Sequence, residues 1–418
     1  MKKLFCVLFV SGILCFSACT PLFPVESPLT ESKTVITVLD GQSTSDPGLE
    51  DMLSEKIASK FPNVVLEWDS MDWGDYFSDE MRSKIASDTL PDIIIGKAQD
   101  VASYYDSGYL ADFGENFTSR IKHDYLKNVT IDGKVYGLPY NMLYQGVLYN
   151  RNIFLRYGLE VPKTAEEMQL VIDRLNEVGM TPFASHFQEN WYSANILMQF
   201  AVNQVFSEYP NWGDEFRQKL HSFSSSKEYI QCFEQVKTVY SNSWPDAITV
   251  NQSKCTKRFA NEEAAMYVTG TWTIQTLRSI RPDMKIGIFP YPNESGDAKL
   301  IYEPNLTFMR NAHSENAELA DEILLAIISD KELAASAAAF TQTESLISGV
   351  DADTLSMIHK DVENYLENAS IRDVTVGNNQ LIWYFQDICT QQMIPWLEGK
   401  TSLENVLEYA DENRSMSH

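Results

Sequence analysis

The chain has 418 residues, with 33 Lys and Arg against 58 Asp and Glu, which gives a formal net charge of −25. A charge of this sign repels nucleic acids, phosphates and anionic lipids, so we expect no nucleic-acid partner and a neutral or cationic ligand. A chain of this length exceeds what one hydrophobic core usually supports, and we expect two domains.

The N-terminus has the pattern of an export signal. Two lysines precede the apolar run Leu4–Phe16, which is shorter than a membrane-spanning helix. The run leads to Cys19 in a pattern that resembles the lipobox of bacterial lipoproteins, although Phe16 stands where that family usually carries Leu. This resemblance implies that residues 1–18 are a lipoprotein signal peptide and that Cys19 is lipidated. Residues 19–33, rich in Pro, Ser and Thr, would tether the protein to the outer face of the cell membrane. A plain secretory signal is the alternative.

Three cysteines, Cys232, Cys255 and Cys389, lie beyond this N-terminal segment. Their wide spacing matches neither a disulfide framework nor a metal-binding motif. We expect buried free thiols, with one disulfide as the alternative, and no bound metal or cofactor.

The first part of the mature chain alternates strands and helices. Apolar β-branched runs predict the strands, and apolar residues at helical spacing predict the helices between them. In chain order we expect a strand at 34–39, a helix at 49–61, a strand at 64–68, a helix at 77–85 and a strand at 91–95. This βαβαβ order is typical of a parallel sheet with helices on both faces.

A second α/β pattern follows. A capping box, Thr164–Glu167, opens a helix that continues through Val178. The other expected elements are strands at 146–150, 181–185 and 264–268, helices around 193–206, 227–241 and 256–262, and an extended crossing segment at 285–292. From Glu315 onward we expect mostly helices, and the alanine run 334–339 is suited to close helix packing.

The loops that follow the expected strands are candidate ligand loops, because open parallel sheets bind ligands beyond the carboxyl ends of their strands. These loops are 41–46, 96–100, 186–191 and 270–272. The chain has no G-x-x-x-x-G-K-[ST] phosphate loop, no G-x-G-x-x-G and no pair of histidines spaced for a zinc helix. The sequence therefore gives no specific reason to propose an enzyme.

Several short segments, taken in their order and spacing, resemble one family. They are 91–95, 108–112, 132–139, 148–154, 158–164, 259–266 and 270–272. Over nearly the whole mature chain the sequence is similar to the extracellular solute-binding proteins of carbohydrate ABC importers, the family that includes maltodextrin-binding protein. The resemblance implies a monomeric receptor that catalyses nothing, captures a sugar and delivers it to permease subunits in the membrane.

The resemblance also implies an α/β fold of two lobes, the periplasmic-binding-protein-like fold of type II. Each lobe would be a mainly parallel sheet flanked by helices, and the chain would cross the hinge three times. We expect the crossings near 128–131, 287–292 and 331–340. The first lobe would then contain residues 34–130 and 290–335, and the second lobe residues 131–289 and 336–418.

Matching to the maltodextrin-binding pattern gives candidate ligand contacts. Sugar rings have apolar C–H faces and hydroxyl rims, which suit aromatic planes and polar side chains respectively. The aromatic candidates are Trp191, Trp272 and Trp383, with Tyr140 and Tyr144 near the hinge, and the polar candidates are Gln42, Asp46, Glu189 and Asp387. Two departures from the pattern, Gly96 in place of Trp and Asp387 in place of Arg, predict a ligand other than maltodextrin.

Three other functions stay open at this point. The net charge would suit a cationic solute, such as a polyamine, bound by the same fold. The chain could instead be a surface enzyme that acts on glycans. It could also report its ligand to a histidine kinase rather than to a permease.

Overall fold

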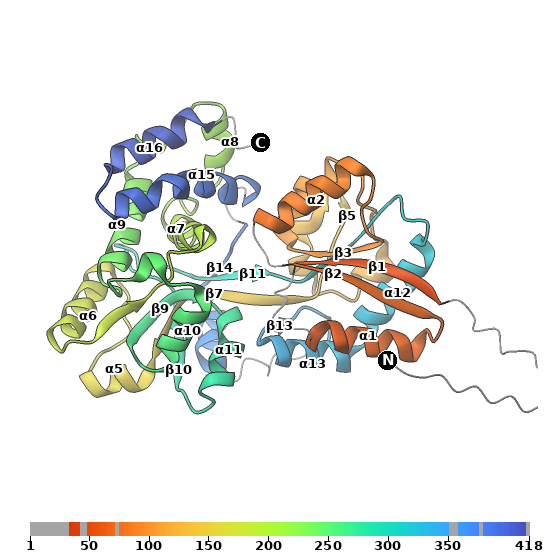
Figure 1. Cartoon of the computed structure of the whole chain (residues 1–418), viewed down its shortest axis with the longest axis horizontal. Coiled ribbons are helices and arrows are strands. Elements are labelled where there is room, and N and C mark those ends of the chain that lie inside the picture. Colours follow the sequence, from red (N-terminus) through yellow and green to blue (C-terminus); the bar gives the residue numbers. More distant parts are fainter. Residues whose placement is uncertain (1–32, 42–47, 72–74, 351–357, 376–378, 415–418) are drawn as a thin grey trace, which may run out of the picture.

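The computed structural model describes residues 33–41, 48–71, 75–350, 358–375 and 379–414. The expected signal peptide, Cys19 and most of the expected tether lie outside these residues. Figure 1 shows two α/β lobes side by side along the long axis of the molecule, with strands β7 and β11 running between them. Each lobe has its own hydrophobic core, as expected for a chain of this length.

The first lobe is built on a five-stranded sheet of order β2-β1-β3-β12-β6. Its strands are β1 (Thr34–Asp40), β2 (Val64–Ser70), β3 (Ile93–Gly96), β6 (Leu138–Pro139) and β12 (Thr307–Arg310). β1 pairs in parallel with β2 and β3, whereas β12 is antiparallel to β3 and β6. Figure 1 shows α2 on one face of this sheet and α1, α12 and α13 on the other; their bounds are Asp75–Ser87, Gly48–Lys60, Ala317–Ser329 and Lys331–Thr341. β3 is buried at every residue because it lies between these two helical layers.

The second lobe is centred on β7 (Asn141–Asn150), which is buried along its whole length. The strands follow the order β14-β11-β7-β9-β8, and β10 and β13 also pair with β7. The bounds are Thr181–Ala184 for β8, Ala264–Gly270 for β9, Ile286–Phe289 for β10, Leu300–Pro304 for β11, Glu344–Ser345 for β13 and Ile371–Asp373 for β14. β7 leads away from the hinge, and β9, β10 and β11 run back beside it in antiparallel pairing. The expectation of a mainly parallel sheet is therefore wrong for this lobe, although β8 pairs in parallel with β9 and β11 with β14.

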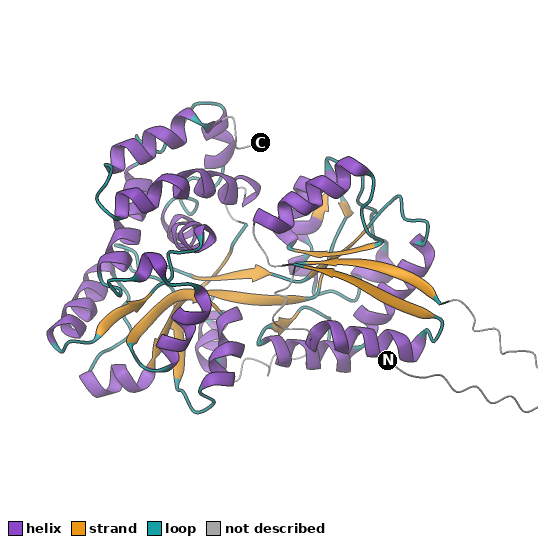
Figure 2. Ribbon diagram, in the orientation of Figure 1, coloured by secondary structure: helices purple, strands orange, loops and turns teal. Residues whose placement is uncertain are grey.

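Helices and short turns complete both lobes, and Figure 2 shows how they surround the strands. In the first lobe these elements are η1 (Ala98–Asp100), α3 (Val101–Tyr105), α4 (Glu115–Thr118), η2 (His123–Tyr125), η3 (Lys127–Val129) and the hairpin of β4 (Thr130–Ile131) and β5 (Lys134–Val135). In the second lobe they are α5 (Arg151–Tyr157), α6 (Ala165–Glu177), α7 (Asn190–Gln204), α8 (Trp212–Arg217), α9 (Lys227–Ser241), η4 (Ala247–Thr249), α10 (Gln252–Ala260), α11 (Trp272–Ile280), α14 (His359–Glu367), α15 (Asn379–Leu397) and α16 (Leu403–Glu412). Among the described helices, none combines the length and the apolar character that a membrane crossing requires.

The expected order of strands and helices is largely confirmed. The capping box forms at α6, where the backbone N–H of Glu167 donates to Thr164 Oγ1 at 3.2 Å. The Glu167 carboxylate accepts from the backbone N–H of Lys163 at 2.6 Å, one residue before the N-cap. Cys232, Cys255 and Cys389 are buried free thiols. The strand expected at 146–150 begins five residues earlier, because β7 carries buried polar side chains that interrupt its apolar pattern.

The hinge crossings lie elsewhere than expected. The first is at Tyr140, between β6 of the first sheet and β7 of the second, rather than at 128–131. The second is at residues 305–306, between β11 and β12, rather than at 287–292. The third lies between Val350, buried in the first core, and Ile358, buried in the second.

These crossings change the lobe boundaries. Residues 131–139 and most of 336–350 belong to the first lobe, and residues 290–304 to the second. Segment 285–292 is apolar and extended because it contains β10, which is buried beside β7. Segment 331–340 is apolar because α13 packs on α1 in the first lobe. Burial within one lobe and passage between lobes produce the same apolar signal in the sequence.

The capping box gives a stability prediction. Replacing Thr164 by Ala removes the oxygen that accepts from the Glu167 N–H, which should lower the free energy of unfolding by about 1 kcal/mol. Thr164→Ser keeps the hydroxyl and should stay within a few tenths of a kcal/mol of the parent. Urea unfolding of both variants measures the difference. Equal loss in both would show that the methyl group, rather than the cap, matters.

Candidate functional site

Two indoles lie together where neighbouring elements of the second lobe end and begin. Trp191 is in the first turn of α7, and Trp272 opens α11 directly after β9. Because β8 and β9 are parallel neighbours, the loops that follow them emerge at the same edge of the sheet. The two ring centroids are 6.4 Å apart, the planes are inclined by 67°, and both side chains are partly exposed. The structure thus brings together two of the expected aromatic contacts, in an arrangement suited to apolar sugar faces.

A glycine at the end of β9 sets the position of the Trp272 ring. A Cβ on Gly270 would lie 1.9 Å from the nearest atom of that ring. No side chain can occupy this space while the indole stays where it is. Gly270 therefore contributes to the site because the absence of a side chain leaves room for the Trp272 ring.

A chain of buried polar side chains begins one helical turn after Trp191. Asn195, one helical turn after Trp191, donates from Nδ2 to Gln145 Oε1 at 2.9 Å. Gln145 on β7 in turn donates to Glu303 Oε2 on β11. Lys97 of the first lobe places its Nζ 3.3 Å from Glu303 Oε1. The chain of contacts therefore connects the second lobe to the loop after β3.

Glu189 is held by its own loop. One carboxylate oxygen accepts from His186 Nδ1 at 2.8 Å, and the other accepts from the backbone N–H of Gln252 at 3.0 Å. Burial raises the pKa of Glu189, but the hydrogen bonds from His186 and Gln252 outweigh it and lower the pKa overall. Burial also lowers the pKa of His186, with Glu189 opposing. A direct ligand contact through Glu189 would have to replace one of these bonds, so its geometry favours a role in holding the Trp191 loop.

Tyr140 and Tyr144 are hinge residues in this structure. The backbone N–H of Tyr140 donates to Leu306 O at 2.7 Å, and its carbonyl accepts from Leu346 N–H at 2.9 Å, so the first crossing is tied to the second crossing and to the residue after β13. The hydroxyl of Tyr144 donates to Glu344 Oε2 at 2.6 Å. Burial, with the Glu344 carboxylate adding to it, raises the pKa of Tyr144 well above its ordinary value. Both rings are buried, which does not support the expected ligand contacts.

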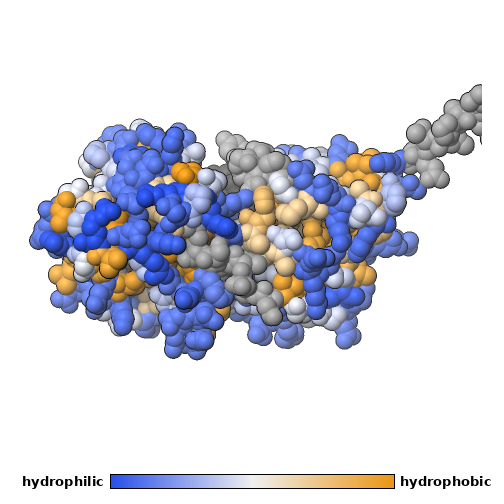
Figure 3. Space-filling view, turned by 90° about the horizontal axis from the view of Figure 1, so that it is seen from below, coloured by the Kyte–Doolittle hydropathy of each residue, from blue (hydrophilic) through white to orange (hydrophobic). Residues whose placement is uncertain are grey.

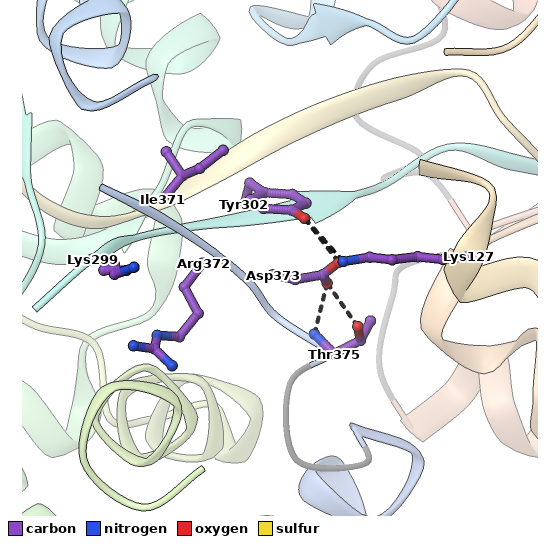
Figure 4. A pocket seen from close by; sticks show the side chains of 7 residues that line it. All are labelled: Lys127, Lys299, Tyr302, Ile371, Arg372, Asp373 and Thr375. Atoms are coloured by element: carbon purple, nitrogen blue, oxygen red, sulfur yellow. Dashed lines mark hydrogen bonds and ion pairs between the residues drawn. The ribbon is translucent and has the colours of Figure 1, made fainter. Parts of the chain in front are cut away.

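A second polar cluster joins the lobes at the edge of the second sheet. Figure 4 shows the Lys127 ammonium of the first lobe beside Asp373 of β14, with Nζ 2.9 Å from Oδ2. Asp373 also accepts from the Tyr302 hydroxyl at 3.0 Å and from Asn128 Nδ2 at 3.1 Å. A cavity of about 400 Å³ lies beside this cluster.

In three ion pairs at the lobe boundary, the first lobe supplies the lysine and the second sheet supplies the carboxylate. Lys97, Lys122 and Lys127 of the first lobe face Glu303, Glu344 and Asp373 of the second-lobe sheet at 3.3, 3.3 and 2.9 Å. The lysines keep part of their solvent contact, so each pair is worth little by itself. Together they make the facing surfaces of the two lobes complementary in charge.

Four expected site residues cannot be placed by side chain. Gln42 and Asp46 lie outside the described residues. Trp383 and Asp387 fall within α15, but their side chains are outside the described part of the structure. Within that part, no three His, Cys, Asp or Glu side chains gather as metal ligands.

The sequence reasoning missed Gln145, Asn195 and Glu303. Each is a polar residue within a largely buried element, namely β7, α7 or β11. A polar residue in such an element is a usable signal, because a buried polar group needs a hydrogen-bond partner. Lys97 lies in a loop that the sequence did identify, 96–100.

Asp100 gives a pH prediction. Burial raises the pKa of Asp100 to about 6, with Glu303 adding to the rise and Lys97 opposing it. The folded state then binds the proton more tightly than the unfolded state, so stability from this group is present below about pH 4 and is lost as the pH rises through about 6. Asp100→Asn, which cannot ionise, should raise the free energy of unfolding at pH 8 by about 1–3 kcal/mol and leave it unchanged near pH 4.

Urea titrations of both proteins at several pH values measure this difference. The exposed residue Asp106 supplies the control, since Asp106→Asn should show no pH-dependent difference. A gain for Asp100→Asn that is equal at pH 4 and pH 8 would contradict the explanation.

The chain is similar to known sugar-binding proteins over part of their length. The chain is 21% identical over 259 residues to the multiple sugar-binding protein of Streptococcus mutans, covering 58% of this chain and 60% of that protein. It is 25% identical over 231 residues to the melibiose/raffinose/stachyose-binding protein MelE of Bacillus subtilis, covering 52% of each. The chain therefore spans less than two thirds of the length of these relatives.

Solved structures share the fold over almost the whole chain. A sugar transporter from Bacillus licheniformis in complex with stachyose superposes with a TM-score of 0.79 at 17% identity, covering 92% of this chain and 100% of that one. RafE in complex with raffinose gives a TM-score of 0.76 at 16% identity, with the same coverage. At these identities the likeness establishes the fold, which is the two-lobed α/β fold of type II solute-binding proteins.

The sequence pattern of one family extends across both lobes. The model of the bacterial extracellular solute-binding proteins matches residues 40–333, which is more than half of the chain. The matched region contains both indoles of the site, the polar chain that begins one helical turn after Trp191 and the first two hinge crossings. The chain therefore belongs to the bacterial extracellular solute-binding protein family.

Proposed function

We propose that this protein captures a sugar, in particular an oligosaccharide, outside the cell and delivers it to the permease of an ABC importer. The observation that carries the proposal is the pair of partly exposed indoles, Trp191 and Trp272, in the same lobe as the Asn195–Gln145–Glu303 chain, which begins one helical turn after Trp191. Indoles pack on the C–H faces of sugar rings, and amides and carboxylates bind their hydroxyls. The names of the two curated relatives and the ligands of the two solved structures support a sugar over other solutes.

The proposal includes a lipid anchor. Cys19 would carry the lipid, and residues 19–33 would let the two lobes reach the permease from the outer face of the cell membrane as a monomer. The lipobox-like pattern and the family's extracellular setting support this arrangement. On the face seen in Figure 3, hydrophilic residues dominate the second lobe, as suits a receptor that works in water.

The hinge offers a way for ligand binding to be signalled to the permease, through closure of the two lobes. A ligand held between lobes that meet at three chain crossings adds contacts to both sides and favours the closed arrangement. The ion pairs from Lys97 and Lys127 would form in that closed arrangement and break when the lobes open. A permease that recognises the closed arrangement would then respond to ligand.

A sugar panel tests the function. Mono- and oligosaccharides, including raffinose and stachyose, are added to the purified protein and the thermal midpoint is measured. A bound sugar at 100 times its Kd should add about 2.7 kcal/mol of stability. Trp272→Ala should weaken that sugar about tenfold or more, because a stacking surface is lost.

Trp68 supplies the matched control, because its indole lies on β2 at the outer edge of the first sheet and donates to Ser54. Trp68→Ala should leave sugar affinity unchanged. No thermal shift with any sugar, or equal affinity loss in both variants, would count against the proposal.

Gly270 provides an independent prediction. Gly270→Ala keeps every polar group but displaces the Trp272 ring, so sugar affinity should fall by about the same factor as in Trp272→Ala. Combining the two substitutions should cost little more than either alone, because both remove one contact. Gly114→Ala, in the first lobe, is the control. Additive losses in the double variant, measured by calorimetric titration, would show that Gly270 acts separately from the indole.

A further inference from the structure

The turn after β3 brings two charged side chains to the second lobe. Lys97 and Asp100 lie on one turn, in which the backbone N–H of Asp100 donates to Lys97 O at 3.1 Å. The turn η1 packs against α15 of the second lobe, and Lys97 reaches Glu303 on β11. This turn is therefore part of the boundary between the lobes.

The Asp100 carboxylate accepts no hydrogen bond from the described residues, and Lys97 is the cation that acts on it. Asp100 is the N-cap residue of α3, a position where Asp usually accepts from the helix backbone, yet its side chain makes no capping hydrogen bond. It is more than half buried. Taking a carboxylate out of water without a hydrogen-bond donor is unfavourable, and the nearby Glu303 carboxylate adds to this cost while Lys97 offsets part of it.

Glu303 is a buried carboxylate of which only one oxygen is hydrogen-bonded within the described structure. The side chain is 2% exposed, and one oxygen accepts from Gln145. The other oxygen, Oε1, has no hydrogen-bond partner within the described structure, although the Lys97 ammonium lies 3.3 Å away as an ion pair. Among the described residues, the two carboxylates thus share the Lys97 ammonium, and the charges of these three side chains sum to one negative charge at the lobe boundary. A neutral hydroxyl could donate to one oxygen but could not balance that charge.

We propose that Asp100 and Glu303, with Lys97 beside them, form a subsite for a protonated aliphatic amine of the ligand. The inference rests on the proposed function, because the amine would be a substituent of the bound sugar, as in an amino sugar. An ammonium group supplies three donors and one positive charge, which matches the two carboxylate positions that lack a hydrogen bond, at Asp100 and at Glu303 Oε1, and the net charge of the cluster. The overall charge of −25 would attract such a ligand toward the cleft. A polyamine carries the same chemistry, and the experiment separates the two sources.

Calorimetric titration at pH 7 compares four kinds of probe. They are di- and trisaccharides of glucosamine and galactosamine with free amines, their N-acetylated forms, the corresponding all-hydroxyl sugars, and spermidine. The free-amine sugar should bind about tenfold or more tightly than its all-hydroxyl counterpart, because a charge-assisted hydrogen bond replaces a neutral one. Asp100→Asn should reduce this ratio to near one without weakening the all-hydroxyl sugar. Asp106→Asn, at the end of the same short helix, should leave the ratio unchanged.

The outcomes distinguish failure of the amine subsite from failure of the proposed sugar receptor. Neutral sugars that bind as well as, or better than, the free-amine forms overturn the subsite and leave the sugar receptor standing. The same amine preference in Asp100→Asn as in the parent also overturns the subsite. Binding of spermidine alone, lost in Asp100→Asn, supports the amine site and overturns the sugar function. Absence of binding by every probe overturns both.

Discussion

The buried strand β7 is the constraint on which the rest of the molecule depends. Every one of its ten residues is buried, so each backbone group on both edges must find a partner inside the protein. β10 and β11 occupy one edge, and β9 and β13 pair along the other. The strand begins at the first hinge crossing and continues into the second core. β7 therefore sets where the first hinge crossing lies, which strands are neighbours in the second sheet and where the polar chain at Gln145 is placed.

Burial of β7 also explains why polar residues occur in it. Gln145 and Asn141 are nearly inaccessible, and both use their side chains to join segments that are distant in the sequence. Asn141 Oδ1 accepts from the backbone of Leu306 at 3.0 Å, which ties the first crossing to the second. Gln145 connects α7 to Glu303 and so to the first lobe. Because an unpaired amide is expensive inside a protein, these contacts hold the two lobes in a defined register.

Two lobes of a strongly acidic protein can approach closely because their facing surfaces carry opposite charges. Lysines from the first lobe meet carboxylates that belong to the second sheet, so the boundary is locally attractive although the chain as a whole is negative. The exception is the surplus carboxylate at the turn 97–100. Such a surplus is unfavourable for the empty protein and is the kind of cost that a bound ligand can relieve.

Local patterns in the sequence determined the alternation of strands and helices and the capping box at Thr164, because these depend on residues close together in the chain. The choice of Trp191 and Trp272 comes from the family resemblance, and their contact with a ligand stays a prediction. The sequence did not determine strand direction in the second lobe or the positions of the hinge crossings, since an apolar run records burial and not the element that buries it. The resemblance also offered Tyr140 and Tyr144 as ligand contacts, whereas both rings are buried in this structure. Only the tertiary structure decided that Lys97, Gln145, Asn195 and Glu303 lie in one chain of contacts, because those contacts join four elements separated by up to about two hundred residues.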